Sequence, residues 1–471
     1  MKNLVWFRRD LRLNDNTALF NACKDAADGV VAVFFITPNQ WNQHNDAPLK
    51  VDFWLKSVAS LSKSLAKIHI PLLVEKCNGF SEVPSAICAL AKKHDCGDIF
   101  FNREYEVNER NRDNAVVRAA SKSKIGVHQF HDRVIVPPRE IKTKDERFYS
   151  VFTPYRKRWD KIAVDFGVLQ KKPRKQKPVD LQSSSVPNRI DGFQFADLPS
   201  EFWPVGEEEA QRRLKKFVTK IDGYGEARDV PSLDGTSQLS PYLAAGVISP
   251  RQCFAAAISA DGGAIGGEGG AARWVSELTW RDFYTHVMVG FPRVSMDLPF
   301  KEKTKKLKWR SSKKDLEAWK AGQTGYPIVD AGMRQLNQTG WMHNRLRMVT
   351  AMFLTKNLLI DWREGEKYFM EKLIDGDLAA NNGGWQWSAS TGTDAVPYFR
   401  IFSPFSQSKR FDPEAQFIKQ MCPELEDVPS KSIHDLNKLS KAIKETGSEY
   451  PTYIVDYKES RDRALAAFKA L

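Results

Sequence analysis

One helix expected near residues 274–284 carries three side chains that suit a ligand better than a core. Trp274, Glu277 and Arg281 are three and four positions apart, so they share one face of such a helix. An acid, a base and an aromatic ring on one face are typical of a pocket for a polar cofactor. Tryptophan clusters in helical domains are more often core, because each ring buries a large area. The polar neighbours favour the pocket here.

Two further polar sets follow later in the chain. Asn344 and Met348 form a pair four residues apart, and Asp375, Asp377 and Asn381 lie in a stretch that ends in two tryptophans. A buried polar group without a partner costs about 1–3 kcal/mol. A ligand rich in donors and acceptors would supply such partners, and an ordinary network of side chains would also do so.

A run of hydroxyl and amide side chains precedes a short helix with an early proline. A helix N-terminus flanked by hydroxyl groups binds phosphate well, and a proline suits the first helical turn. A simple helix cap explains the same residues. Taken together with the other polar sets, this run makes phosphate binding a hypothesis that competes with a simple helix cap. Its residues are Thr236, Ser237, Gln238, Leu239 and Ser240.

The elements before these sets predict an α/β domain. Strands are expected at residues 2–7, 30–36, 71–75, 98–102 and 127–131. They alternate with helices expected at 17–27, 51–67 and 81–94, and with one that begins near Glu106. Short strands that alternate with helices predict βαβ units and a doubly wound parallel sheet.

The sequence of the rest of the chain predicts a linker followed by a helical region. Residues 137–204 are rich in Pro, Ser and Lys, with a helical pattern only at 149–166, and helix-length segments dominate after 205. We therefore expect an α/β domain at 1–132, a linker at 133–205 and a large all-helical domain at 206–471. A loop at 262–270 holds six glycines but lacks the order of a phosphate-binding motif, and we assign it no function.

Composition restricts the class of protein and of partner. The net charge of +13 suits a polyanion, although a merely basic enzyme would also have it. No apolar run approaches the length of a membrane span, and no cleavable signal pattern opens the chain, so we expect a cytoplasmic protein without a membrane partner. The six cysteines and eight histidines are scattered, which predicts no metal site.

Five segments together resemble DNA photolyases and cryptochromes. They are residues 4–12, 234–237, 274–284, 339–345 and 375–382, and the resemblance runs nearly end to end. It is strongest to the class I cyclobutane pyrimidine dimer photolyases of bacteria. The resemblance implies a light-driven enzyme, a deoxyribodipyrimidine photo-lyase. Excited, reduced FAD would lend an electron to a pyrimidine dimer flipped out of UV-damaged DNA and would recover it after ring splitting. It also implies a monomer that associates with the bacterial nucleoid when bound to DNA.

The resemblance also implies which residues hold FAD. Tyr224 and residues 236–240 would contact the diphosphate region. Asn381 would face the reactive edge of the flavin, where repair enzymes carry Asn and plant cryptochromes carry Asp. The other FAD contacts would be Trp274, Glu277, Arg281, Asn344, Asp375, Gly376 and Asp377.

The dimer and the DNA have their own implied contacts. Trp280 and Trp387 would pack on the two bases, Met348 would add an apolar contact, and Asn344 and Glu277 would hydrogen-bond the pyrimidine edges. Electron transfer from the surface to the flavin would use Trp309, Trp362 and Trp385. Phosphate contacts would come from Arg228, Arg345, Arg347 and Arg400.

An antenna pigment is implied in the N-terminal domain. His44, Asn108 and Glu109 match positions that bind methenyl-tetrahydrofolate. Where folate binders have a Cys-Lys pair in the flavin domain, this chain has Ser295-Met296. A deazaflavin, another flavin or an empty site therefore remain alternatives to the folate.

Four other functions are weighed against dimer repair. A cryptochrome photoreceptor usually carries a long C-terminal extension, whereas the last expected helix here ends close to Leu471. A DASH cryptochrome usually has Tyr at the position of Trp387, and a (6-4) photolyase needs two pocket histidines, of which only His343 is apparent. A non-catalytic flavin-binding or nucleotide-binding module would leave irradiated DNA unchanged.

Overall fold

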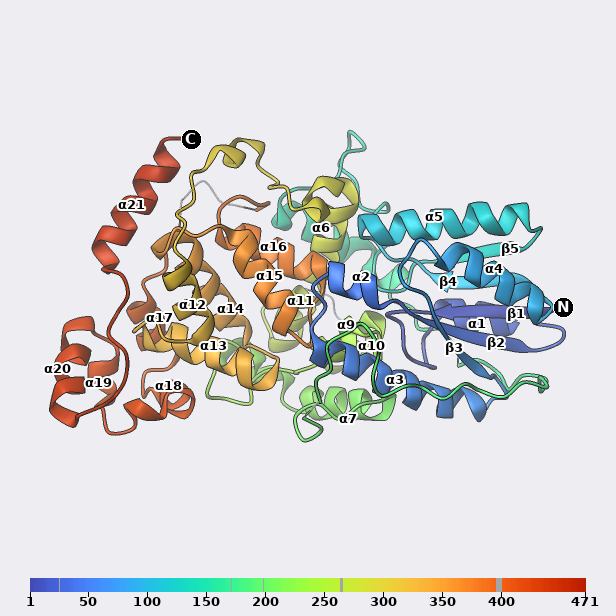
Figure 1. Cartoon of the computed structure of the whole chain (residues 1–471), viewed down its shortest axis with the longest axis horizontal. Helices are drawn as coiled ribbons and strands as arrows, with labels where there is room; N and C mark the ends of the chain where they lie inside the picture. Colours follow the sequence, from blue (N-terminus) through green and yellow to red (C-terminus); the bar gives the residue numbers. More distant parts are fainter. Residues whose placement is uncertain (25, 171, 198, 263–265, 395–399) are drawn as a thin grey trace. The chain divides into compact units, whose positions relative to one another are not determined.

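Two compact units interleave along the chain. The computed structural model describes all residues except 25, 171, 198, 263–265 and 395–399 (Figure 1). The first unit comprises Met1–Asp222, Ser237–Ser295 and Ile374–Ala379, and the second comprises Gly223–Thr236, Met296–Leu373 and Ala380–Leu471. The two units are defined by tertiary contacts, and each combines segments that are far apart in the sequence. The domain limits expected at residues 132 and 205 therefore stay a prediction.

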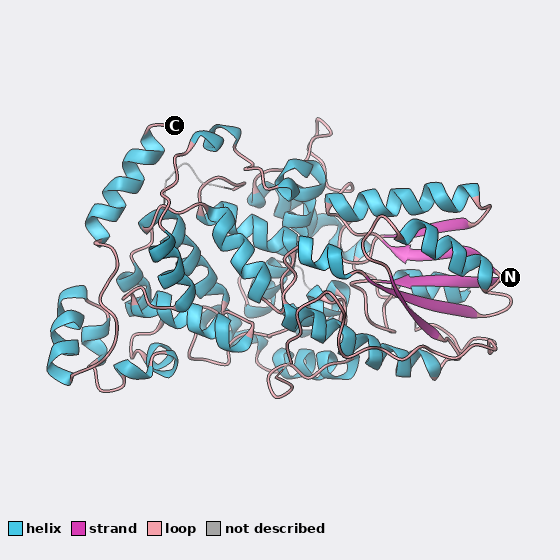
Figure 2. Cartoon of the chain, in the orientation of Figure 1, coloured by secondary structure: helices cyan, strands magenta, loops and turns pink. Residues whose placement is uncertain are grey.

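A five-stranded parallel sheet forms the centre of the first unit. The strands appear magenta in Figure 2, and their order is β3-β2-β1-β4-β5, with every neighbouring pair parallel. The predicted doubly wound sheet is confirmed. The strands are β1 (Lys2–Phe7), β2 (Val30–Ile36), β3 (Leu72–Lys76), β4 (Cys96–Asn102) and β5 (Gly126–Phe130).

Helices cover both faces of this sheet, which explains why all seven residues of β2 are buried. Leu4 and Trp6 of β1 pack with α4 (Val83–Lys93) and α5 (Val107–Lys122). Right-handed crossovers then place α1 (Thr17–Lys24) and α3 (Pro48–Ala66) on the opposite face. One short helix was not predicted, α2 (Pro38–Gln43), because six residues are too few to show a helical period.

The linker region covers an edge of the sheet and contributes one helix. Leu72 of β3 accepts a hydrogen bond from the Ser184 N–H (2.9 Å) and donates its own N–H to Ser183 Oγ (3.1 Å). This pairing protects an edge strand that would otherwise expose unpaired backbone groups. The predicted helix at 149–166 is α6 (Phe152–Phe166).

The remaining elements of the first unit include the helix that carries Trp274, Glu277 and Arg281. They are α7 (Glu207–Val218), the 3₁₀ turn η1 (Ile221–Gly223) at the border of the units, α9 (Ser240–Ala244), α10 (Pro250–Ala260) and α11 (Gly270–Gly290). Residues 263–265 of the glycine-rich loop lie outside the described residues.

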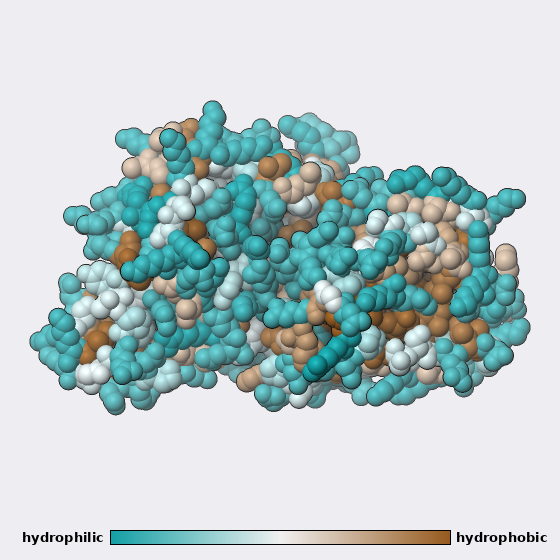
Figure 3. Space-filling model, in the orientation of Figure 1, coloured by the Kyte–Doolittle hydropathy of each residue, from teal (hydrophilic) through white to brown (hydrophobic). Residues whose placement is uncertain are grey.

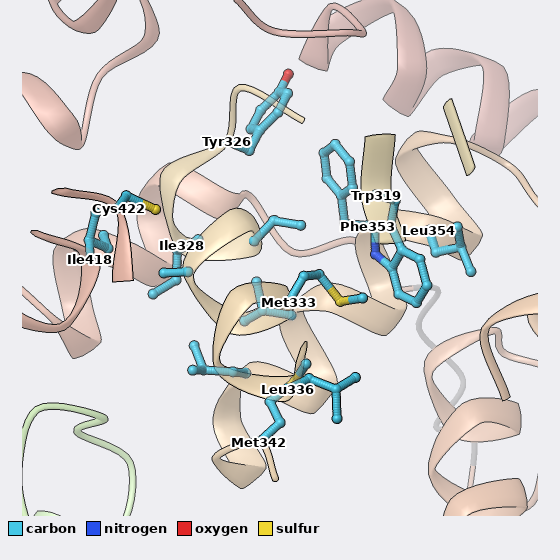
Figure 4. Close-up of a cluster of buried hydrophobic side chains, with 14 of the residues drawn as sticks. Trp319, Tyr326, Ile328, Met333, Leu336, Met342, Phe353, Leu354, Ile418 and Cys422 are labelled. Carbon is cyan, nitrogen blue, oxygen red and sulfur yellow. The ribbon is translucent and has the colours of Figure 1, made fainter. Parts of the chain in front are cut away.

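The second unit is helical throughout its described part and has its own core. Figure 4 shows Ile328, Met333 and Leu336 of α13 packed in this core with Trp319 and Phe353. Its α-helices are α8 (Tyr224–Ala227), α12 (Lys313–Ala321), α13 (Pro327–Thr339), α14 (Asn344–Met352), α15 (Trp362–Lys372), most of α16 (Leu378–Ser388), α17 (Pro404–Phe411), α18 (Gln416–Met421), α19 (Ser430–Ile433), α20 (Leu436–Thr446) and α21 (Tyr457–Lys469). A π-helix, η4 (Phe353–Asn357), follows α14. The 3₁₀ turns are η2 (Pro292–Met296), which is shared with the first unit, η3 (Glu302–Lys306) and η5 (Pro423–Leu425).

The surface is mainly hydrophilic on the face drawn in Figure 3, where hydrophobic residues show mostly over the sheet near β3. Among the described residues, no helix combines the length and the apolar character that crossing a membrane requires.

Candidate functional site

Helix α11 carries the first predicted set of polar residues. Trp274, Glu277 and Arg281 all lie on this continuous 21-residue helix, so the predicted helix is confirmed. Trp274 is buried and packs against Phe217, with ring centroids 4.7 Å apart. Arg281 donates a hydrogen bond to the carbonyl of Arg133, and burial lowers the pKa of its guanidinium while Asp377 opposes that shift.

The segment 375–377 is fixed by two basic side chains of the same unit. Lys50 Nζ donates to the carbonyl of Gly376 (2.9 Å), and Arg133 Nη2 lies 2.8 Å from Asp377 Oδ2. Asp375, the residue that precedes Gly376, is buried. The first unit therefore holds Asp377 and Arg281 through one shared neighbour, Arg133.

The hydroxyl-rich segment leads into α9 as predicted, because that helix begins at Ser240. Ser237 Oγ accepts a hydrogen bond from the Leu239 N–H (3.4 Å), and Arg213 Nη1 donates to Gln238 Oε1 (3.2 Å). Ser237 to Ser240 belong to the first unit, whereas Thr236 is the last residue of a short segment of the second.

That short segment of the second unit contains Tyr224 and a close backbone contact. A Cβ on Gly235 would lie 2.6 Å from the carbonyl oxygen of Ala227, so only glycine fits there. Tyr224 is buried on α8, and the Arg228 guanidinium lies 5.4 Å from the centre of its ring.

Helix α14 begins at Asn344 and carries Met348 one turn later, as expected. Its cap is His343, whose Nδ1 accepts a hydrogen bond from the Arg345 N–H (3.2 Å). Burial lowers the pKa of His343 to about 4, so this histidine is neutral at pH 7 and acts as a helix cap.

The predicted phosphate-binding arginines are partly engaged within the second unit. Arg345 Nη2 lies 2.8 Å from Asp229 Oδ2, and Arg228 Nε lies 3.8 Å from the other oxygen of that carboxylate. Arg347 Nε donates to the carbonyl of Met342 (2.8 Å), and Arg400 is exposed. Asp229 is an acidic partner that the sequence analysis missed.

Helix α16 holds Asn381 through a network of side chains. Asn381 Nδ2 donates to the carbonyl of Glu366 (3.0 Å), and Asn382 Nδ2 donates to the carboxylate of the same residue (3.0 Å). Gln386 Nε2 then donates to Asn382 Oδ1 (2.9 Å). Burial raises the pKa of Glu366 to about 7. Trp387 lies half-buried one residue beyond this network.

The three tryptophans of the predicted electron relay share one hydrophobic cluster. Trp385 and Trp362 are 2% and 1% exposed, and Trp309 packs against the same cluster while partly exposed. Trp385 fits against α15 because residue 365 is glycine: a Cβ there would lie 2.1 Å from its ring. One relay tryptophan thus reaches solvent and two are buried.

Trp280 is stacked on an aromatic partner in the first unit. Its ring centroid lies 3.6 Å from that of Phe152, and the two planes differ by 5°. Phe283 and Tyr284 are also neighbours of Trp280, and the ring centroid of each lies 5.6 Å from that of the indole. One face of the indole is therefore covered by the ring of Phe152.

The three predicted antenna residues lie together in the first unit. Asn108 Nδ2 lies 3.0 Å from His44 Nε2, and His44 Nδ1 lies 3.6 Å from Glu109 Oε1. Gln40 of the unpredicted helix α2 also bonds His44 (2.8 Å). Burial, and then the charge of Glu106, raise the pKa of Glu109 to about 8.

Comparison with known proteins decides the family. Residues 3–178 match the family model described as DNA photolyase, and residues 274–470 match the FAD binding domain of DNA photolyase. The deoxyribodipyrimidine photo-lyase of Escherichia coli K12 is 44% identical over 475 residues, which cover 99% of this chain and 98% of that protein. The chain belongs to the DNA photolyase family.

Solved structures of photolyases and a cryptochrome share this fold. An archaeal photolyase from Sulfolobus tokodaii, solved with two FAD molecules, aligns with a TM-score of 0.83 and 31% identity over 100% of both chains. A cryptochrome from Synechocystis aligns with a TM-score of 0.87 and 27% identity over 99% of both chains. Because both kinds of protein share the fold, sequence similarity rather than shape favours the photolyases.

The residues present fit the FAD of this family. FAD needs a ring face, hydrogen-bonding partners and close backbone approach for its diphosphate. The first unit offers the buried ring of Trp274 and the carboxylates of Asp375 and Asp377. The second unit, taken by itself, offers the restricted turn at Gly235.

Four residues that organise the photolyase motifs escaped the sequence analysis. Arg133 and Phe152 contact residues more than one hundred positions away, so no local pattern could reveal them. Asp229 and Glu366 belong to no sequence motif. Only their contacts identify them: Asp229 pairs with Arg345, and the carbonyl of Glu366 accepts a hydrogen bond from Asn381.

Proposed function

We propose that this chain uses blue light to split cyclobutane pyrimidine dimers in DNA, with FAD as its cofactor. The observation that carries the proposal is the 44% identity to a deoxyribodipyrimidine photo-lyase over 99% of the chain. The proposal also implies that the chain acts as a monomer in the cytoplasm and joins the bacterial nucleoid when it binds DNA.

In this proposal the polar residues of the photolyase motifs hold FAD. When bound in its reduced form, FAD supplies light-driven electron donation and takes the electron back after the ring opens. The residues that hold it are Tyr224, Thr236, Ser237, Gln238, Leu239, Ser240, Trp274, Glu277, Arg281, Asn344, Asp375, Gly376, Asp377 and Asn381.

Asn381 has a specific task in this proposal. Its Nδ2 donates to the carbonyl of Glu366, so the orientation of the amide is set by the main chain of α15. A neutral amide beside a reduced, anionic flavin adds no second negative charge. The side chain therefore supports the form of the cofactor that donates an electron.

The dimer would be extruded from the duplex, which costs less for a damaged base step. Trp280, supported from behind by Phe152, and Trp387 would pack on its two bases, with Met348 as a further apolar contact. Glu277 and Asn344 would bond the pyrimidine edges. Because no side chain has to attack the ring, the task of the protein is placement and electrostatics.

Binding of the surrounding DNA would use phosphate contacts, which position the duplex without reading its sequence. Arg228, Arg345, Arg347 and Arg400 are the residues that would make them. Arg228 and Arg345 would exchange part of their interaction with Asp229 for phosphate. Such binding weakens as salt rises.

An antenna pigment would bind at His44, Asn108 and Glu109, and methenyl-tetrahydrofolate is the candidate. The Sulfolobus tokodaii structure holds two FAD molecules and implies a novel light-harvesting cofactor. A second FAD is therefore one alternative, beside a deazaflavin and an empty site. The absorption spectrum of a gently purified sample distinguishes them, since the folate adds a near-ultraviolet band without extra flavin.

The test of the whole proposal uses the purified chain and an oligonucleotide that carries one thymine dimer. We expect a yellow or blue flavoprotein that removes dimers under blue light and leaves them intact in the dark. A chain that binds FAD and leaves dimers unchanged in the light contradicts the proposal and favours a cryptochrome-type photoreceptor.

A further inference from the structure

A chain of ion pairs connects the candidate antenna residues with the candidate flavin residues inside the first unit. Glu109 Oε1 lies 3.8 Å from Arg9 Nη2, and the same nitrogen lies 2.8 Å from Glu106 Oε2. Glu106 Oε1 lies 3.5 Å from Arg133 Nη1, and Arg133 Nη2 lies 2.8 Å from Asp377 Oδ2. All five side chains are less than one fifth exposed.

Burial makes this chain sensitive to the loss of any member. Charges in a protein interior interact strongly, and removal of one partner leaves an uncompensated charge behind. Glu104 reinforces the middle of the chain, because its carboxylate pairs with Arg9 and Arg112 and lies 3.8 Å from Arg133 Nη1. A change at Glu109 therefore alters the field that Arg9 and Arg133 experience.

Arg133 is the point at which the chain reaches the flavin motifs. Its guanidinium pairs with Asp377, while its main-chain carbonyl accepts the hydrogen bond from Arg281. Both of these residues are candidate FAD contacts from separate parts of the sequence. Displacement of Arg133 would move both of them.

We propose that Arg133 is a positioning residue for FAD, and that the chain Glu109–Arg9–Glu106–Arg133–Asp377 couples the antenna site to the flavin site. The inference rests on the proposed function and adds a link between its two ligand sites. Such a coupling is reciprocal: whatever changes the state of one site changes the affinity of the other by the same factor.

The first experiment measures the FAD affinity of the full chain in the absence of DNA, by removing FAD and titrating it back while recording its fluorescence and visible circular dichroism. Arg133→Met should weaken FAD binding about tenfold, since it releases Asp377 and leaves Glu106 with Arg9 alone. Arg133→Lys keeps the charge and should recover part of the affinity. Unchanged affinity in both variants would overturn the positioning role.

The matched control is Arg251→Met. Arg251 is a buried arginine of the same unit that pairs with Asp15 and Asp132, neither of which belongs to this chain of ion pairs. It should lower the unfolding midpoint as Arg133→Met does, yet leave FAD affinity within about twofold, because it pairs with no member of the chain and no candidate FAD residue. Equal losses of FAD affinity in both variants would show that only general destabilisation is measured.

The second experiment tests the coupling by a double-mutant cycle. The titrations of this cycle are made at pH 9, because the pKa of Glu109 is raised to about 8 and its carboxylate must be ionised to pair with Arg9. At this pH, Glu109→Gln leaves Arg9 to Glu106 and Glu104, so Arg133 pairs more fully with Asp377, and FAD should bind about threefold more tightly. The same substitution in the Arg133→Met or Arg133→Lys background should have a much smaller effect. An undiminished effect in both backgrounds would overturn the coupling. Neither readout depends on DNA or on dimer repair, so wild-type repair activity tests the proposed function separately.

Discussion

At the scale of single residues, the stack of Phe152 on Trp280 would limit how the indole meets a base in the proposed complex with DNA. A ring pair of this kind contributes about 0.5–1.5 kcal/mol beyond its buried area. Phe152 sits at the start of α6, far from α11 in sequence, so its role is to fix the plane of Trp280 without contacting the reacting atoms.

We therefore expect Phe152→Ala to weaken binding of dimer-containing DNA about two- to tenfold, since the loosened indole loses its stacking energy. Fluorescence anisotropy in the dark measures this affinity. Phe152→Tyr should restore it, whereas Phe195→Ala, at an exposed ring of the linker, should not change it. Wild-type affinity of Phe152→Ala would mean that the stack has no part in substrate binding.

The relay tryptophans allow a second prediction at this scale. Trp362→Phe keeps an aromatic ring in the cluster but removes the group that is most easily oxidised. Photoreduction of oxidised FAD should stop, while repair by enzyme reduced beforehand should continue. Transient absorption and a repair assay measure the two processes. Trp319→Phe, at a buried ring of the same cluster, is the control and should keep photoreduction.

Some contacts between residues followed from sequence and others could not. His44, Asn108 and Glu109 lie together as the family resemblance implied. Asp229 beside Arg345 was not foreseen, because a single acid between basic residues carries no pattern that distinguishes a partner from a solvated charge.

At the scale of elements, Asp132 joins the end of β5 to α1 and α10. Its carboxylate pairs with Arg12 and Arg251 and accepts the hydrogen bonds of Thr17. Burial alone would raise the pKa of Asp132, but the two arginines hold it below its ordinary value. The carboxylate therefore stabilises the fold above pH ~4, and this contribution is lost as the pH falls towards the folded-state pKa.

Asp132→Asn should lower the free energy of unfolding at pH 7 by about 3–5 kcal/mol, because the buried Arg12 loses its carboxylate partner and the buried Arg251 keeps only Asp15. The variant should also lose less stability than wild type between pH 7 and pH 3. Urea unfolding at both pH values measures this. Asp145→Asn, at an exposed ion pair, serves as the control. Parallel pH profiles for Asp132→Asn and wild type would contradict the assignment.

Helices and strands with a clear period were predicted well from sequence. β1 and β2 have the expected limits, because apolar runs flanked by turns define buried strands. The end of α1 at Lys24 came three residues earlier than expected, since alanines continue the pattern without deciding where the helix stops. Periodicity cannot detect α2, which is set by Pro38 and by packing of Trp41.

At the scale of the whole molecule, the net charge of +13 predicts DNA binding that depends on salt. Each phosphate contact contributes about 0.9 to the slope of log K against log salt. Arg400→Ala should therefore lower this slope by about one, equally for damaged and undamaged DNA. Titrations at several salt concentrations measure it. Arg212→Ala, at an exposed pair on α7, should leave the slope unchanged.

The interleaving of the two units was not predictable from one sequence. Their borders at 236/237 and 379/380 fall inside the motif segments 234–237 and 375–382, where the sequence shows no change in composition. The family motifs identify these segments as functional, yet nothing in their residue types says that the chain changes unit there.

This interleaving has a consequence during synthesis. The Lys50 ammonium group of α3 donates to the carbonyl of Gly376, which leaves the ribosome more than three hundred residues later. Asp377, the partner of Arg133, follows that arginine by 244 residues. The nascent sheet domain must therefore persist with these basic groups held only by their earlier carboxylate partners, and both late contacts can form only when most of the polypeptide has emerged. A fragment that stops at Asp222 would remain permanently in that unfinished state.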